Sequence, residues 1–186
     1  DSNKETRLAN ILRVKDKLAS HPDVESACVL GWAYINSQGN ASSEISIDST
    51  ESFYVHRVPA FIDQQFFETY GIKSAPGSPS PEELSKTATG KNGYIITRDL
   101  AELLFPGENA VGKNMLTIHQ GDTLYQPIHG VVEPITPYIM RGNDPLMFTV
   151  SPIKNSKYTP NILIRIKPEV DMKIFVGKLR PWMHKE

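Results

Sequence analysis

Residues 107–114 read Gly-Glu-Asn-Ala-Val-Gly-Lys-Asn, which fits the phosphate-binding pattern G-x-x-x-x-G-K-[ST] at every fixed position except the last. In such a loop the backbone amides and the lysine hold the phosphates, and the final hydroxyl holds Mg²⁺. Asn114 has no hydroxyl. The segment is also expected to follow a helix and open a strand, so no helix N-terminus would face a phosphate. We interpret it as a helix-terminating loop and expect no nucleotide to bind there.

Other residues that could do chemistry lack the spacing that chemistry needs. The five histidines follow no metal-ligand pattern such as H-E-x-x-H. A hairpin could bring His119 and His129 face to face, but no further ligands can be placed beside them. Glu102 and Glu133 could be read as a carboxylate pair, although a solvated helix face and a loop are the favoured interpretation. No G-x-S-x-G elbow occurs. The sequence therefore predicts no catalytic residue, no metal ligand, no cofactor-binding residue and no enzyme.

Composition narrows the class of protein. The 186 residues carry a formal net charge of −1 and 39% hydrophobic residues, which supports a packed core and gives no basic footprint for nucleic acid. Cys28 is the one cysteine, so an internal disulfide is impossible. It stands in an apolar run and is expected to be a buried small hydrophobe. No stretch approaches the roughly 18 apolar residues of a membrane span.

The first third of the chain alternates between helical and strand patterns. Residues 4–20 place Leu8, Ile11, Leu12 and Leu18 on one face of an amphipathic helix. A helix packed on a sheet is favoured over a membrane-surface helix, because Glu5 and Asp16 dilute its basic face. Strands are predicted at 24–35, 44–48 and 53–58, with Pro59 ending the last or marking a sheet edge. Asp63 is expected to cap a short helix that runs to Tyr70 and stops at Gly71.

The middle of the chain contains the most regular pattern. Residues 74–93 are rich in Ser, Pro, Gly and Thr and predict an exposed mobile loop, with at most one helical turn at 81–85. A strand at 94–96 leads to Thr97 as helix cap, and Pro106-Gly107 ends that helix. A strand at 115–118 and its partner at 124–132 follow as a hairpin.

The last third begins with a proline-rich crossing that forbids a long helix. A short strand is predicted at 146–150 within it. Ile162, Ile164 and Ile166 alternate with Leu163, Arg165 and Lys167, which indicates a half-buried strand over 161–167. Pro168 is then expected to start a helix through Arg180, with its apolar face at Val170, Ile174, Phe175 and Leu179.

The order of these segments resembles the MacB-like periplasmic core domain of ABC transporter permeases of the FtsX-like family. The matching stretches are Phe66–Ile72, Tyr94–Thr97, Leu100–Phe105, Gly107–Lys113, Ile128–Val132 and Ile162–Pro168. Each stretch is short, but their order and spacing cover most of the chain. The family usually carries a "GR.F" segment where Ser74–Ser78 stands here, so the resemblance does not extend to that loop.

The resemblance implies an α+β fold with two lobes. A porter-like lobe would be built from residues 1–62 and 150–186, and an inserted, mainly β, sabre-like lobe with a helix would be built from 63–149. The chain is then expected to be a soluble segment of a membrane protein, between two membrane spans, at the periplasmic face of the bacterial inner membrane. Its two terminal helices should lie side by side, with their outer ends on one face.

The implied function is to couple ATP-driven motion to export or release of a peptide, toxin or lipoprotein. The implied partners are a second permease copy or half, a cytoplasmic nucleotide-binding subunit reached through the membrane domain and, as a further option, a periplasmic adaptor with an outer-membrane duct. No nucleic acid is implied. The alternative is an extracellular ligand-binding or sensor module of a membrane protein, which a deep apolar pocket with convergent polar groups would favour.

Overall fold

The computed structural model describes residues 2–31, 41–47, 52–90, 93–119, 122–135, 145–156 and 159–183. The predicted strand positions 32–35 and the hairpin turn at Gly121 lie outside these ranges. The helices are α1 (Ser2–Ala19), α2 (Phe66–Tyr70), α3 (Pro81–Gly90), α4 (Arg98–Leu104) and α5 (Met172–Met183), with a 3₁₀ turn η1 (Ile153–Asn155). The strands are β1 (Val24–Gly31), β2 (Ala41–Ser46), β3 (Ser52–Ile62), β4 (Tyr94–Thr97), β5 (Asn114–His119), β6 (Asp122–Val132), β7 (Leu146–Pro152) and β8 (Asn161–Ile166).

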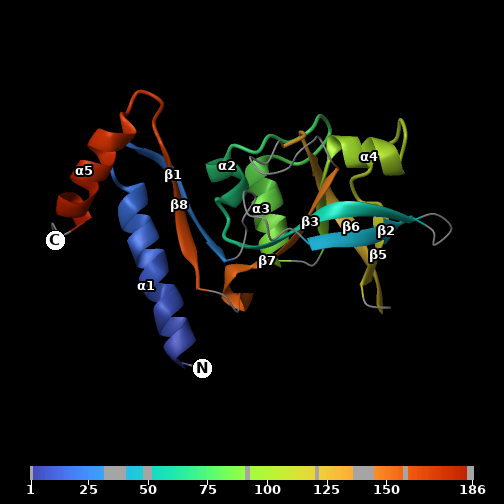
Figure 1. Ribbon diagram of the computed structural model, residues 1–186, viewed down its shortest axis with the longest axis horizontal. Helices are drawn as coiled ribbons and strands as arrows, with labels where there is room; N and C mark the ends of the chain where they lie inside the picture. The colour runs from blue at the N-terminus through green and yellow to red at the C-terminus, as the bar shows by residue number, and fades with distance from the viewer. Residues whose placement is uncertain are drawn as a thin grey trace.

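Six of the strands form a closed ring, which we call the barrel. Their order is β2–β5–β6–β4–β7–β3, and β2 also pairs with β3, which completes the ring. The β3–β7 and β4–β6 pairs are parallel and the other pairs are antiparallel. Closure gives each of these strands a partner on both sides, so the barrel exposes no strand edge. Figure 1 shows the barrel at one end of the molecule, with α4 beside it.

Alternation along the barrel strands supplies two separate hydrophobic cores. On β7, Met147 belongs to the core inside the barrel, whereas Leu146 and Phe148 belong to a second core between the barrel wall and the helices. On β4, Tyr94 and Ile96 face the first core and Ile95 faces the second. Successive side chains of a strand point to opposite faces, so strands that read as unbroken apolar runs are those buried on both faces.

The two remaining strands, β1 and β8, form an antiparallel pair that we call the ribbon. Among the described residues it joins the barrel through two pairs, Leu30 with Ile62 and Gly31 with Phe61. Helix α1 packs on one face of the ribbon and α2 on the other. Cys28 and Leu30 face the helix-side core. Figure 1 shows α1, α5 and the ribbon together at the end of the molecule opposite the barrel.

The predicted mobile loop at 74–93 is wrong at 81–90, because these residues form α3, which extends the expected helical turn at 81–85 to ten residues. Leu84 and Ser85 of this helix are fully buried. The sequence carried the signal in Ser80-Pro81-Glu82-Glu83. The Glu83 backbone N–H donates to Ser80 Oγ at 3.3 Å, and the Ser80 N–H donates to Glu83 Oε2 at 2.8 Å. This is a capping box with proline at the first helical position, which outweighs the weak helix formers behind it.

Two expected strand and helix boundaries are also wrong. Strand β3 continues through Pro59, which sits opposite Thr149 of β7. The other side of β3 pairs with β2 as far as Arg57 and with β1 from Phe61. Pro59 lies between these two sets of hydrogen bonds, at a position where its lack of an N–H is tolerated. Pro168 does not start α5, which begins at Met172. Asp171 is its cap instead, since Asp171 Oδ1 accepts from the Lys173 and Ile174 amides.

Two expected caps serve other roles. Thr97 precedes α4 but makes no side-chain cap bond. Its hydroxyl donates to the Leu146 carbonyl and accepts from the Leu146 amide, which ties β4 to β7. Asp63 stands too early to cap α2, whose N-cap is Gln65. Gly71 does end α2 as expected, in the left-handed conformation at φ 70°.

Candidate functional site

The loop at Gly107–Asn114 lies where the sequence placed it, after α4 and before β5. Gly107 and Gly112 both adopt positive φ, at 71° and 84°, which explains the glycines without a ligand. Lys113 forms an ion pair with Glu108 and lies 4.6 Å from the centre of the Phe105 ring. The lysine that would hold phosphates in a nucleotide site is thus engaged within its own loop.

A hollow of about 360 Å³ adjoins this loop, and segment 75–78, α4 and the loop line it. Its charged side chains already have partners. Arg98 pairs with Glu133 at 3.1 Å, and Glu102 Oε1 accepts from the Gly107 amide at 3.1 Å. Glu102 and Glu133 are therefore separately engaged, and the arrangement contains no paired carboxylates and no nucleophile beside a base.

The histidines that the structure describes do not gather into a site. The β5–β6 register places His119 opposite Asp122, at the far end of the hairpin from His129, so the expected facing pair is wrong. His21 packs edge-on against Phe175 and Trp182 of α5. Among the described residues no three His, Cys, Asp or Glu side chains lie close enough to hold a metal ion.

A buried polar cluster centred on Asp63 was not foreseen from the sequence. Asp63 Oδ2 accepts from the Val29 amide at 2.8 Å, and Oδ1 accepts from the Gln65 amide at 3.1 Å. Lys15 of α1 approaches Oδ2 at 3.8 Å. Burial raises the pKa of Asp63, while the two amide donors and Lys15 oppose that rise. The cluster fastens α1, β1 and the segment after β3 at the point where the ribbon meets the barrel.

Cys28 lies against this cluster and is fully buried, as the sequence predicted. Burial raises the pKa of its thiol from the ordinary 9.0 to about 12, and the negative charge of Asp63 adds to the effect. A thiol with so high a pKa has almost no thiolate at neutral pH, so Cys28 is unsuited to nucleophilic catalysis.

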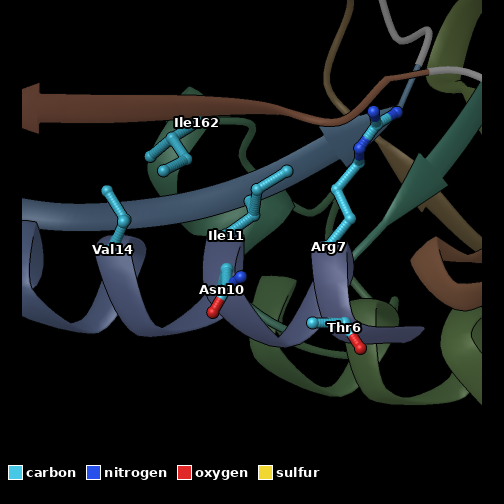
Figure 2. A pocket seen from close by; sticks show the side chains of 6 residues that line it. All are labelled: Thr6, Arg7, Asn10, Ile11, Val14 and Ile162. Atoms are coloured by element: carbon cyan, nitrogen blue, oxygen red, sulfur yellow. The ribbon is translucent and has the colours of Figure 1, made fainter. Parts of the chain in front are cut away.

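A second hollow, of about 380 Å³, lies between α1 and β8 (Figure 2). Ile11 and Val14 point from α1 toward Ile162 and form its apolar part. Thr6, Arg7 and Asn10 line the remainder and give it a polar rim. We call this feature the α1–β8 groove. It is shaped to receive an apolar group beside polar and cationic side chains, and it has no arrangement for catalysis.

The sequence and the fold were each compared with those of known proteins. No family model matches the sequence, and no curated protein sequence matches it. Solved structures match in fold. The periplasmic region of MacB from Actinobacillus actinomycetemcomitans is 15% identical, with a TM-score of 0.53, over 90% of this chain and 70% of that one.

Two further structures agree. A domain described as a permease protein from Porphyromonas gingivalis is 17% identical, with a TM-score of 0.55, over 89% of this chain and 72% of that one. The extracellular domain of the ABC-type transporter YknZ from Gram-positive bacteria is 13% identical, with a TM-score of 0.50, over 89% and 75%. The fold is therefore that of the extracytoplasmic domains of ABC transporter permeases. In particular, it is the fold of the MacB periplasmic domain, as the motif order had indicated.

Proposed function

We propose that this chain is the extracytoplasmic domain of an ABC transporter permease, at the periplasmic face of the bacterial inner membrane. The observation that supports this most is the similarity in fold to three such domains over 89–90% of the chain. The described residues that line the two hollows form no catalytic arrangement. No helix in the described ranges is long and apolar enough to cross a membrane.

The domain would act as a mechanical coupler between lobes. We assign residues 1–62 and 150–186 to a porter-like lobe and 63–149 to an inserted sabre-like lobe. Helices α1 and α5 would receive motion from membrane helices. The two helices meet at the C-terminal end of α1. There Lys17 Nζ donates to the carbonyl of Met183, the last residue of α5, at 2.9 Å, and His21 packs on Phe175. The Asp63 cluster would then pass displacement of α1 to the ribbon and the barrel.

The complex would contain a second permease copy or half and a cytoplasmic nucleotide-binding subunit whose ATP hydrolysis drives the motion. Its cargo would be a peptide, toxin or lipoprotein, with a periplasmic adaptor and an outer-membrane duct as further partners. These assignments rest on the resemblance of the motif order to the MacB-like family, and the structural neighbours support the permease context alone.

The test is a distance measurement in the full-length transporter that contains this chain. With Cys28 replaced by Ala, spin labels are placed at Arg13 on α1, in the porter-like lobe, and at Tyr125 on β6, in the sabre-like lobe, which are both exposed. We expect their distance distribution to shift between the nucleotide-free and the ADP–vanadate state. A matched pair at Leu103 and Tyr125, both exposed and both within 63–149, should not shift. Identical distributions for Arg13–Tyr125 in both states, in a preparation that hydrolyses ATP, would overturn the coupling role.

A further inference from the structure

Strand β8 differs from every other described strand in having a strand partner on one side only. It pairs with β1 from Asn161 to Ile166, and its outer edge meets no described strand. Proteins usually protect such edges with bulges, prolines or inward charges, because an open edge can pair with another chain. Here the bulge lies in β1, between Val24 and Ser26, and β8 stays regular. Its one charged side chain, Arg165, turns toward α2, where Nε donates to the Thr69 carbonyl.

The α1–β8 groove lies along this open edge. The register places Ile164 opposite Ala27 and Ile162 opposite Val29, on the ribbon face that α1 covers. Ile162 and Ile164 remain half-buried, because α1 lies mainly over β1. A strand added beside β8 would place every second side chain in the groove, against Ile11 and Val14 of α1. Edge and groove therefore form one continuous surface.

The helix that forms one wall of the groove is basic, whereas the chain as a whole has a small negative charge. Helix α1 carries five basic and two acidic side chains, a formal charge of +3, and the whole chain is −1. Arg7 is the one charged residue that lines the groove, it is exposed, and no ion pair is recorded for it within the described residues. Figure 2 shows Arg7 near the start of β8. A ligand of complementary charge would carry a carboxylate at that end.

We propose that the outer edge of β8 and the α1–β8 groove bind an extended segment of a partner chain. The segment pairs antiparallel to β8, has apolar side chains at alternate positions and carries a carboxylate near its C-terminal end, facing Arg7. A lipid chain could fill the apolar part of the groove but would leave the edge amides and carbonyls of β8 without strand partners. The edge therefore favours a peptide, and this binding role stands apart from the transport role.

The test uses a synthetic peptide of alternating Val and Thr with one Glu near its C-terminus. Peptide is titrated into the isotope-labelled chain, and backbone amide shifts are followed by NMR. We expect the shifts that change to map to β8 and to the groove face of α1. Arg7→Gln should weaken binding about two- to fivefold, as expected for a partly exposed ion pair. Arg13→Gln removes a charge from α1 outside the groove and should leave affinity unchanged.

A second peptide with the same side chains but N-methylated at alternate amides separates strand pairing from groove filling. It should not bind, because it cannot complete a ladder with β8. No shift change at millimolar peptide, equal binding of the N-methylated peptide, or equal losses in the two arginine variants would each overturn the proposal. Binding of the chain to phosphatidylglycerol vesicles without any peptide binding would assign the surface to lipid instead.

Discussion

The barrel strands and β8, the outer strand of the ribbon, both alternate their apolar side chains, but they bury those side chains to different extents. In the barrel, Ile45 and Met115 are fully buried. In the ribbon, Ile162 and Ile164 of β8 are only half-buried, although they alternate in the same way. The difference comes from closure. Barrel strands enclose their own core, whereas the ribbon depends on α1 and α2 to cover its two faces.

The two regions also differ in how they are attached. Every barrel strand has partners on both sides, while the described part of the ribbon is joined to β3 through two residue pairs and the Asp63 cluster. Segments with few attachments and partly exposed backbone open more readily than a closed core. We therefore expect the ribbon to open before the barrel unfolds, which suits a region proposed to receive motion and to bind a partner.

The largest expected effect is on the reactivity of Cys28, in the ribbon. A rise in its pKa from 9.0 to about 12 lowers the thiolate fraction near pH 8 about a thousandfold, and burial blocks reagents as well. Labelling of the native chain by a thiol reagent should therefore be slower than that of the urea-unfolded chain by at least about that factor.

The urea dependence of the same reaction compares the two regions. We expect Cys28 to become reactive at a lower urea concentration than the one at which amides of β4 and β6 lose hydrogen-exchange protection. Coincident transitions would show that ribbon and barrel open as one unit and would remove the distinction drawn above.

The next largest effect is on the free energy of unfolding when an isoleucine is replaced by alanine in each region. Ile45→Ala leaves a cavity in the barrel and should lower the free energy of unfolding by about 2–5 kcal/mol. Ile162→Ala removes a half-buried side chain from the open side of the groove and should cost about 1 kcal/mol. Urea denaturation of both variants measures the difference. Equal losses would mean that the groove is as tightly packed as the barrel.

Much of this fold could be predicted from the sequence because period-two and helical patterns are local. The strands around Tyr94, Ile128 and Ile164 and the amphipathic α1 lie where their patterns placed them. The Ser, Pro, Gly and Thr content of 74–93 predicts a loop, whereas the capping box at Ser80 favours the full helix α3. The box is a local signal of four residues, so the length of α3 is predictable from the sequence.

Other features depend on contacts that no local pattern records. Ring closure rests on β2 pairing with both β3 and β5, which are far apart in the chain. The role of Asp63 depends on Val29 and Lys15, and the groove depends on α1 lying beside β8. Such long-range pairings are chosen by the global packing, so they appear only in three dimensions.

A smaller loss of stability is expected when a buried pair of hydroxyl groups inside the barrel is broken. The Tyr94 hydroxyl and Thr117 Oγ1 lie 2.7 Å apart within the barrel core. Tyr94→Phe or Thr117→Val leaves the other hydroxyl buried without this partner, at a cost of about 1–2 kcal/mol. The double variant should lose less than the sum of the two single losses. Strict additivity in a double-mutant cycle would show that the two hydroxyls do not interact.

The smallest expected effect tests the junction itself through the pH dependence of stability. Because burial raises the pKa of Asp63, the folded chain keeps this proton over a pH range in which the unfolded chain has released it. The contribution of Asp63 to stability is then greatest below the unfolded pKa, near about 3.9, and declines as pH rises through the folded pKa. Two amide donors and Lys15 oppose the shift, so the change should be modest.

Asp63→Asn removes this titration while keeping one carbonyl acceptor at the junction. We expect the stability of the unaltered chain relative to Asp63→Asn to rise as pH falls from neutral toward about 4, by urea denaturation at each pH. A relative stability that instead falls with falling pH would mean that Lys15 and the amide donors outweigh burial. The junction would then be a strong ionic fastening between α1 and the barrel, and the ribbon would be less free to open than its two residue pairs suggest.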